Sequence, residues 1–254
     1  MAKTKTAKAG YRLSKISTNA EAGMDKDEIK GKTRAILQEL DELQNLLYAE
    51  AKHSLLVVIQ GMDASGKDGL IRDVFTSMNP QGVNVASFKV PTAEEAAHDF
   101  LWRIHRQVPA KGMVQIFNRS HYEDVLVTRV HGTCDDKTAA IRMKAINAFE
   151  QLLQENNTHV IKLYLHVSHE EQLKRLQERI HIPRKMWKYN ESDITESNHW
   201  DTYRKYYEEV FEQCNKVPWH IIPSDQNWYK SYQVALILQK TLKGLKMKYP
   251  GLKK

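Results

Sequence analysis

Cysteine is scarce in this sequence: two of the 254 residues are cysteines, Cys134 and Cys214. They lie far apart and match neither a metal-binding spacing nor a disulfide framework. Chains that depend on disulfides belong to oxidising compartments. The scarcity therefore argues against a small secreted fold, and we expect a cytoplasmic protein.

Long hydrophobic runs are absent as well. No apolar stretch approaches the roughly 20 residues that a membrane-spanning helix needs. The first residues are polar and rich in lysine, with no apolar stretch behind them as in a signal peptide. We also find no internal repeat and no low-complexity linker. We therefore expect no membrane partner and, at this length, one α/β domain.

Negative charge is outweighed by positive charge, with a formal net charge of +7 at pH 7. This balance points to a polyanionic partner, which could be nucleic acid, an anionic surface or phosphate itself. Part of the charge lies in the two tails, where it could simply keep the ends soluble. No recognised nucleic-acid-binding motif accompanies it, so we expect no nucleic-acid partner.

The segment from Leu55 to Lys67 carries the most specific pattern. Five apolar residues, 55–59, predict a buried parallel strand, and a loop bounded by Gly61 and Gly66 leads through Lys67 into a helix-compatible run. A strand, then G-x-x-x-x-G-K, then a helix is the order of a phosphate-binding loop. Its backbone N–H groups, the positive end of the helix and the charge of Lys67 suit phosphate oxygens. An ordinary glycine-rich turn is the alternative.

Two acidic residues of this loop need separate explanations. Asp68 stands where the common loop has Ser or Thr to bind magnesium, so we expect its carboxylate to point away from the phosphates. Asp63, inside the loop, is then a candidate metal ligand. The alternative for Asp63 is a turn residue bonded to its own backbone. The loop is therefore not that of a common GTPase or ATPase.

Helices and strands alternate along most of the chain. Residues 1–25 look like an irregular basic tail, and residues 26–51 form a helix with apolar residues at helical spacing. The further predicted strands are 85–88, 114–117, 160–167 and 219–222, and the further predicted helices are 93–107, a stretch ending at 130, 137–155, 170–179, 200–213 and 227–249. This alternation predicts a parallel sheet covered on both faces, in a single domain over residues 26–254.

The segment 116–130 starts at the carboxyl end of a predicted strand, where ligands bind to open α/β sheets. Most phosphate-loop enzymes end this strand with an acidic residue that holds magnesium, but here it is the uncharged Asn118. Arg119 follows and suits a bidentate grip on phosphate. Asp124, next to Glu123 and one helical turn later, could reach the metal that Asn118 cannot hold. A solvated acidic face at a helix start is the alternative for this pair.

A basic segment interrupted by proline, 174–190, lies between the last two predicted strands. Its cationic residues are Lys174, Arg175, Arg179, Arg184, Lys185 and Lys188. In phosphate-loop kinases this region is a lid that closes over the transferring phosphoryl group and excludes water. The alternative is a solvated charged face. We expect a lid at about residues 180–200, although residues 180–198 look polar and irregular.

Several stretches together resemble the second family of polyphosphate kinases: GMDASGKDG, NPQGVNVASFKVPTAEEAAHDFLWR, FNRSHYEDVLVTRV, and PW and IP at the last strand. The similarity runs from about residue 46 to about residue 249. It implies a thymidylate-kinase-like P-loop kinase, a three-layer α/β/α sandwich with a parallel five-stranded sheet and a helical lid. The family carries GKDG, which accounts for Asp68. Asn118 in place of aspartate resembles the subgroup that phosphorylates both AMP and ADP.

The resemblance also implies roles for individual residues. Those expected to act in catalysis are Asp63, Lys67, Arg119, Asp124 and Arg179, with Asp63 and Asp124 as metal ligands. Those expected to bind polyphosphate are Ala64, Ser65, Gly66, Lys67, Asp68, Arg175, Arg179 and Lys185. Those expected to bind the nucleotide are Lys89, Asn118, Arg119, Glu123 and Arg129.

The activity that the resemblance implies is a reversible transfer of the terminal phosphoryl group of inorganic polyphosphate to AMP and ADP, giving ADP and ATP. It implies magnesium, or manganese in its place, as cofactor, GMP and GDP as further candidate acceptors, and a homodimer or homotetramer. An acceptor phosphate is already an anion, so no general base is needed and His121 is predicted to be structural. The rival is an ATP-dependent nucleoside monophosphate kinase of the same fold, which needs an adenine pocket beside the loop.

Overall fold

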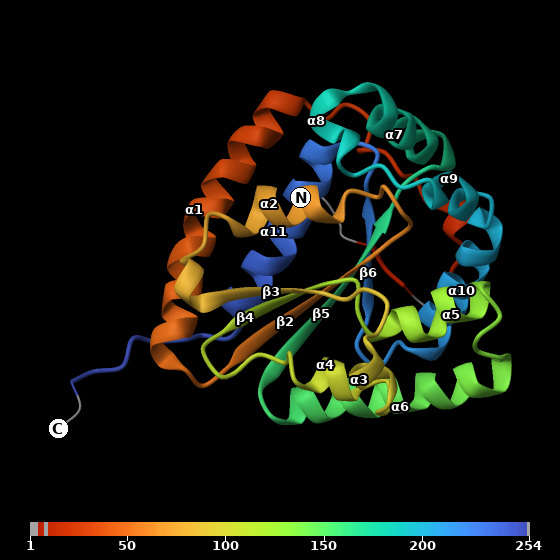
Figure 1. Cartoon of the computed structure of the whole chain (residues 1–254). Helices are drawn as coiled ribbons and strands as arrows, with labels where there is room; N and C mark the ends of the chain where they lie inside the picture. The colour runs from red at the N-terminus through yellow and green to blue at the C-terminus, as the bar shows by residue number, and fades with distance from the viewer. Residues whose placement is uncertain (1–4, 8–9, 253–254) are drawn as a thin grey trace.

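The computed structural model describes residues 5–7 and 10–252 and is built on one central sheet (Figure 1). The strands lie in the order β1-β6-β5-β2-β4-β3. Their bounds are β1 (Lys5–Thr6), β2 (Ser54–Gln60), β3 (Val83–Ser87), β4 (Val114–Asn118), β5 (Thr158–His166) and β6 (Trp219–Pro223). Strands β2 to β6 pair in parallel, which confirms the predicted five-stranded parallel sheet. The two-residue β1 adds an antiparallel strand beside β6.

Helices cover both faces of the sheet (Figure 1). The longest are α1 (Lys26–Glu50), α2 (Lys67–Phe75), α6 (Asp136–Glu155), α10 (Trp200–Gln213) and α11 (Asn227–Gly244). In β2, Leu55, Val57 and Ile59 pack with α1, α2 and α11, whereas Leu56 and Val58 pack with α6 and α10. All five side chains are fully buried, as a parallel strand covered on both sides requires. The predicted three-layer sandwich is confirmed.

Helix α1 begins and ends at local signals in the sequence. The Asp25 carboxylate accepts two backbone N–H groups of the first turn. The buried apolar residues then recur at helical spacing: Ile29, Ile36, Leu40 and Leu47. Ala51 ends the helix with a left-handed φ of 53° and donates its N–H to the Leu47 carbonyl.

The N-terminal segment is more ordered than the irregular tail expected from the sequence. It contains β1 and the short 3-10 helix η1 (Leu13–Lys15). The Ala7 N–H donates to the Trp219 carbonyl at 2.9 Å, and the Ala7 and Leu13 side chains are buried in the layer of α6 and α10. One of these contacts is a backbone hydrogen bond and the others involve isolated apolar side chains, so no periodic pattern in the sequence predicts them.

The predicted helix 93–107 is wrong. The structure has two short helices there, α3 (Ala93–Ala96) and α4 (Trp102–His105). Asp99 separates them because its carboxylate accepts the Leu101 N–H at 2.9 Å and builds a turn. The closing helix is also shorter than predicted, since α11 ends at Gly244.

The lid region contains more helix than its sequence suggests. After α7 (His169–His181), the segment predicted to be irregular carries α8 (Pro183–Met186) and α9 (Ser192–Ser197). Pro183 starts α8 at a position where no N–H is needed. Helices α7 to α9 lie beyond the arrowhead of β5, at the carboxyl end of the sheet (Figure 1), so a helical lid is in place.

The remaining short elements complete the connections. They are η2 (Pro80–Gly82), η3 (His121–Val125) and α5 (Val127–Val130), the last two forming the stretch predicted to end at 130. After β2, the chain forms β3 and β4 on one side of β2 within the sheet, and then β5 and β6 on the other side of β2. Such a switch point is where ligands bind in open α/β sheets, and it lies at the carboxyl end of β2.

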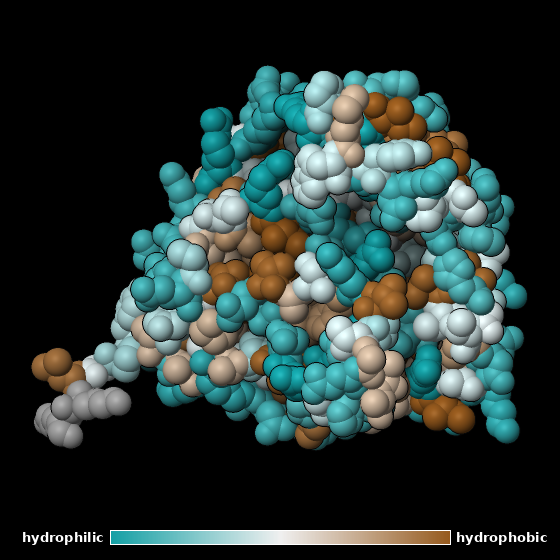
Figure 2. Space-filling view, viewed as in Figure 1, coloured by the Kyte–Doolittle hydropathy of each residue, from teal (hydrophilic) through white to brown (hydrophobic). Residues whose placement is uncertain are grey.

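In the part of the chain that the structure describes, no helix is both long enough and apolar enough to cross a bilayer. The face shown in Figure 2 is mostly hydrophilic, with apolar residues in separate spots.

Candidate active site

The loop between β2 and α2 wraps around the Lys67 ammonium. Gly61 and Gly66 have positive φ angles of 156° and 92°, which glycine adopts without strain. Lys67 Nζ donates to the Gly61 carbonyl at 2.9 Å and to the Met62 carbonyl at 3.2 Å. Burial, followed by the charge of Arg119, lowers the pKa of Lys67 to about 8. A bound anion would stabilise this ammonium.

Asp63 lies between two arginines from different elements. Its Oδ1 is 3.7 Å from Arg119 Nη2, and its Oδ2 accepts from Arg179 Nη1 of α7 at 3.1 Å. Burial would raise the pKa of Asp63, but Lys67 and the two arginines outweigh it and hold that pKa below its ordinary value. Arg179 Nη1 also pairs with Asp193 of α9 at 2.5 Å. The structure thus brings together three residues predicted from the sequence: Asp63, Arg119 and Arg179.

Asp68 reaches out of the loop toward β4 and the lid. Its carboxylate accepts from Asn118 Nδ2 at 2.9 Å and from Lys188 Nζ at 3.0 Å. Burial would raise the pKa of Asp68, but these two hydrogen bonds outweigh it and the pKa is lowered. The carboxylate therefore has cationic and amide partners of its own.

Glu123 and Asp124 are neighbours on η3, but their carboxylates interact with different cationic side chains. Burial has the largest effect on the pKa values of Lys67 and Arg119 and lowers both. The negative charge of Glu123 acts in the opposite direction and raises both pKa values. Asp124 Oδ2 instead lies 3.6 Å from Arg103 Nη2, and burial raises the pKa of this carboxyl. Asp124 Oδ2 is buried without a hydrogen-bond partner in the described part of the chain.

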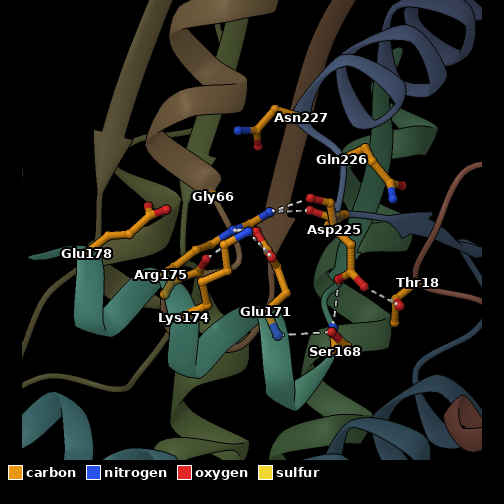
Figure 3. Close-up of polar contacts among 12 residues, drawn as sticks. Thr18, Gly66, Ser168, Glu171, Lys174, Arg175, Glu178, Asp225, Gln226 and Asn227 are labelled. Carbon is orange, nitrogen blue, oxygen red and sulfur yellow. Dashed lines mark hydrogen bonds and ion pairs between the residues drawn. The ribbon is translucent and has the colours of Figure 1, made fainter. Parts of the chain in front are cut away.

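Arg175 of α7 connects three parts of the structure (Figure 3). Its Nε donates to Glu171 at 2.9 Å, its Nη1 to the Ala64 carbonyl at 3.1 Å, and its Nη2 to the carbonyls of Ser224 at 2.7 Å and Asp225 at 3.0 Å. Four of the five N–H groups of the guanidinium are used in this way. The described contacts of Arg175 are thus those of a brace between the loop and the segment that precedes α11.

Three predicted site residues make contacts of another kind. Lys185 pairs with Glu178 of α7. The Arg129 guanidinium pairs with Asp136 at 2.7 Å and Glu209 at 3.0 Å, and it lies over the Tyr206 ring. Lys89 is exposed, and its carbonyl accepts from Arg103. None of these contacts joins the group around Asp63.

A buried polar network lies behind η3. Glu150 accepts from the Tyr122 hydroxyl at 2.7 Å and from Lys162 Nζ at 2.8 Å, and it lies 3.4 Å from His121 Nε2. Glu150, Lys162 and His121 are fully buried. His121 thus has the surroundings predicted for a structural histidine, and the network anchors the segment that carries Glu123 and Asp124.

Sequence reasoning missed several residues that touch the site. They are Gln172, Asp193 and Lys230, which contact Asp63, Arg179 and Gly66 respectively. Lys230 interrupts a run of buried residues in α11, and a charged residue in an apolar stripe was the available signal. Lys188 lay in the basic segment, but its contact with Asp68 had no local signal.

A phosphate loop follows the central parallel strand β2. Arg119, which follows the neighbouring strand β4, and Arg179, from a lid helix, both pair with Asp63 of this loop. This arrangement defines a phosphate-loop kinase. The model of one protein family, described as polyphosphate kinase 2 (PPK2), matches residues 23–250. The chain belongs to this family.

Individual relatives agree with this assignment. The chain is 49% identical over 215 residues to an AMP/ADP-polyphosphate phosphotransferase of Meiothermus ruber, across 84% of this chain and 80% of the relative. It is 40% identical over 231 residues to an ADP-polyphosphate phosphotransferase of Rhodopseudomonas palustris, across 85% and 80%. The crystal structure of polyphosphate kinase 2 from Arthrobacter aurescens TC1 matches with a TM-score of 0.95 at 40% identity, across 98% of this chain and 91% of that one. The chain is therefore an enzyme of the transferase class.

Proposed function

We propose that this enzyme transfers the terminal phosphoryl group of inorganic polyphosphate to AMP and ADP, giving ADP and ATP. Membership of the polyphosphate kinase 2 family and the 49% identity to an AMP/ADP-polyphosphate phosphotransferase support the donor and both acceptors. The net charge of +7 suits a polyanionic donor.

The contact between Asn118 and Asp68 is the observation that carries the choice of acceptors. Asn118 Nδ2 donates to Asp68 at 2.9 Å, whereas an aspartate at 118 would place two carboxylates against each other. The amide leaves the end of β4 uncharged. Less negative charge faces the acceptor there, so a nucleotide whose phosphate tail is one unit shorter or longer can bind.

Positioning and charge supply the catalysis in this proposal. The N–H groups of residues 64–67 and the Lys67 ammonium bind donor phosphates, while Arg119 and Arg179 approach the transferring group from β4 and from the lid. Both arginines are already gathered on Asp63, at 3.7 Å and 3.1 Å. An acceptor phosphate oxygen is an anion at neutral pH, so no side chain has to remove a proton.

Asp63 and Asp124 are the proposed ligands of a divalent metal ion, of which magnesium is the first choice. No group of three or more His, Cys, Asp and Glu side chains able to hold a metal occurs among the described residues. Magnesium needs only one or two carboxylates beside phosphates and water. The buried Oδ2 of Asp124 makes no hydrogen bond among the described residues and lies 3.6 Å from Arg103 Nη2, so it is available to a further cation. When bound, the metal would neutralise charge on the phosphates.

The test is to incubate the enzyme with magnesium, long-chain polyphosphate and AMP, and to resolve ADP and ATP over time. We expect ADP first and ATP after it, and ADP should also react when supplied alone. Reaction of ADP without reaction of AMP would contradict the dual acceptor. Activity with ATP but not with polyphosphate as donor would favour the rival nucleoside monophosphate kinase.

Location and assembly are further parts of the proposal. Two free, buried cysteines suit the cytoplasm, where nucleotides are abundant. A homodimer or homotetramer stays a prediction, which light scattering coupled to size-exclusion chromatography would measure.

A further inference from the structure

A phosphate-binding loop has two faces with different needs. When its N–H groups point at an anion, the carbonyl groups of the same peptides point back into the protein. Buried carbonyl oxygens need hydrogen-bond donors. In this chain, side chains from α7 and α11 provide them.

The donors reach three carbonyls from outside the loop. Gln172 Nε2 donates to the Asp63 carbonyl at 3.1 Å, Arg175 Nη1 to the Ala64 carbonyl at 3.1 Å, and Lys230 Nζ to the Gly66 carbonyl at 3.0 Å. Gln172 and Lys230 are almost completely buried, at 3% and 0% exposure. The carbonyl face of the loop is thus held by two helices that the chain reaches much later.

Lys230 makes a second hydrogen bond and lies close to the backbone of Gly66. Its ammonium donates to Asn227 Oδ1 at 2.8 Å as well as to Gly66. A Cβ on residue 66 would collide with Lys230 Nζ and would also meet Arg175 Nη1 at 3.5 Å. Glycine at 66, which the positive φ of 92° also favours, thus leaves space for the Lys230 ammonium beside the loop.

We propose that Lys230 and Arg175 are positioning residues of the phosphoryl transfer, which hold the Gly66 and Ala64 carbonyls so that the N–H groups of the loop keep the geometry that binds the donor phosphates. The proposal relies on the proposed function only for the identity of the donor. Gln172 acts beside them on the Asp63 carbonyl.

Direct contact with polyphosphate is the rival role for both residues. Lys230 has no exposed surface, and four N–H groups of Arg175 already donate to protein oxygens. Burial is the main reason that the pKa of Lys230 is lowered to about 7; the charges of Arg175, Lys67 and Arg72 also lower it, and Asp73 opposes them. An anion on the far side of the loop would relieve this repulsion without touching Lys230.

The experiment compares Lys230→Met and Arg175→Met with Lys240→Met, an exposed lysine of the same helix. Steady-state kinetics with polyphosphate and ADP are measured at two salt concentrations. We expect the first two variants to lose about 10- to 100-fold in kcat, because a small displacement of a binding loop has effects of this size. The dependence of the polyphosphate KM on salt should stay as in the wild type, because no phosphate contact is lost. Lys240→Met should behave as the wild type in kcat.

Hydrogen exchange of the substrate-free enzyme provides the second readout. Amides of residues 61–68 should exchange faster in Lys230→Met and Arg175→Met than in the wild type. In Lys240→Met, their exchange should be unchanged. Unchanged loop exchange, or a salt dependence that weakens as for a lost phosphate contact, would overturn the proposal. If Lys230→Met does not fold, Arg175→Met decides by the same criteria. Because this readout needs no substrate, failure of polyphosphate as donor would refute the proposed function alone.

Discussion

At the scale of single residues, the site places opposite charges in direct competition. Asp63 pairs with Arg119 and Arg179, and Asp68 pairs with Lys188. Bound phosphates would compete with Asp63 and Asp68 for these cations, so the cationic side chains that pair with these carboxylates are available to a polyanion. Lys67 differs from these cations because the described hydrogen bonds of its ammonium go to carbonyl groups of the loop and not to a carboxylate.

Replacing Lys67 by alanine should depress turnover severely. The ammonium lies inside the loop and would contact phosphates throughout the reaction, so we expect a loss of about 100-fold or more in kcat, as for removal of one charge-stabilising donor. The loss should be equal for short and long polyphosphate, which kinetics with donors of defined length would measure. A loss that shrinks as the donor lengthens would contradict this role.

Conservative substitutions can distinguish the proposed metal ligands, Asp63 and Asp124, from Glu123. We expect Asp63→Asn and Asp124→Asn each to lose roughly a hundredfold or more in turnover, since the stabilisation borne by the metal is reduced. Glu123→Gln should be milder. Titration of activity with magnesium would show whether the loss is one of metal affinity. Near-normal turnover of Asp124→Asn at saturating magnesium would make Glu123, whose charge acts on Lys67, the better candidate.

At the scale of elements, α7 combines two arginines with different tasks. Arg175 braces the phosphate loop against the segment before α11, whereas Arg179, one turn further, ties Asp63 to Asp193 of α9. Helix α7 is therefore linked to the phosphate loop, to the segment before α11 and to α9. Closure would exchange the carboxylate partners of Arg179 for phosphate oxygens.

Arg179→Ala should mainly lower kcat, as expected of a contact that strengthens in the transition state. Lys174→Ala is the matched control, because Lys174 lies on the same helix with its side chain 66% exposed and pairs with Glu171. It should change kcat little. A rise in KM alone for Arg179→Ala would mean that the arginine binds the donor without assisting transfer.

Lys185→Ala tests whether the polymer passes over the outer lid. We expect a higher KM for polyphosphate and a weaker salt dependence, since one fewer contact releases fewer counterions. Kinetics at two salt concentrations would measure both. An unchanged salt dependence would leave Lys185 as the surface partner of Glu178 that the structure describes.

The elements differ in how far the sequence predicts them. The phosphate loop was predictable because strand, glycines, lysine and helix follow each other within a short segment. The brace by Arg175 and the contact of Lys230 were not, because they join residues 111 and 164 positions apart and need the whole sheet to be assembled. The break at Asp99 was missed because a side-chain turn interrupted an otherwise helical pattern. Asp124 shows a third limit. It is adjacent to Glu123 in the 3-10 helix η3, but the two carboxylates have different surroundings, which the sequence alone does not reveal.

At the scale of the whole molecule, the fold encloses a charged network in its core. Glu150 and Lys162 are fully buried and 2.8 Å apart, with Tyr122 and His121 beside them. A buried charge is tolerated when its partner is present and is unfavourable when its partner is removed. The stability of the sandwich thus depends on this pair being intact.

Glu150→Gln should lower the free energy of unfolding by about 3–5 kcal/mol, since Lys162 is left buried without its counter-charge. Urea denaturation would measure it, with the exposed Glu155→Gln of the same helix as the control that changes little. The double variant Glu150→Leu with Lys162→Met should recover much of the loss. An effect below about 1 kcal/mol for Glu150→Gln would mean that water reaches the pair.

The short strand β1 has a practical consequence for how the protein is produced. The family match begins at residue 23, yet Lys5 and Thr6 pair with Ile221 and His220 along the outer side of β6. A shortened protein that begins at residue 23, where the family match begins, would lack β1. The backbone of its β6 would then be open to strands of other copies. We expect that shortened protein to aggregate as its concentration rises, which dynamic light scattering in comparison with the 254-residue chain would detect.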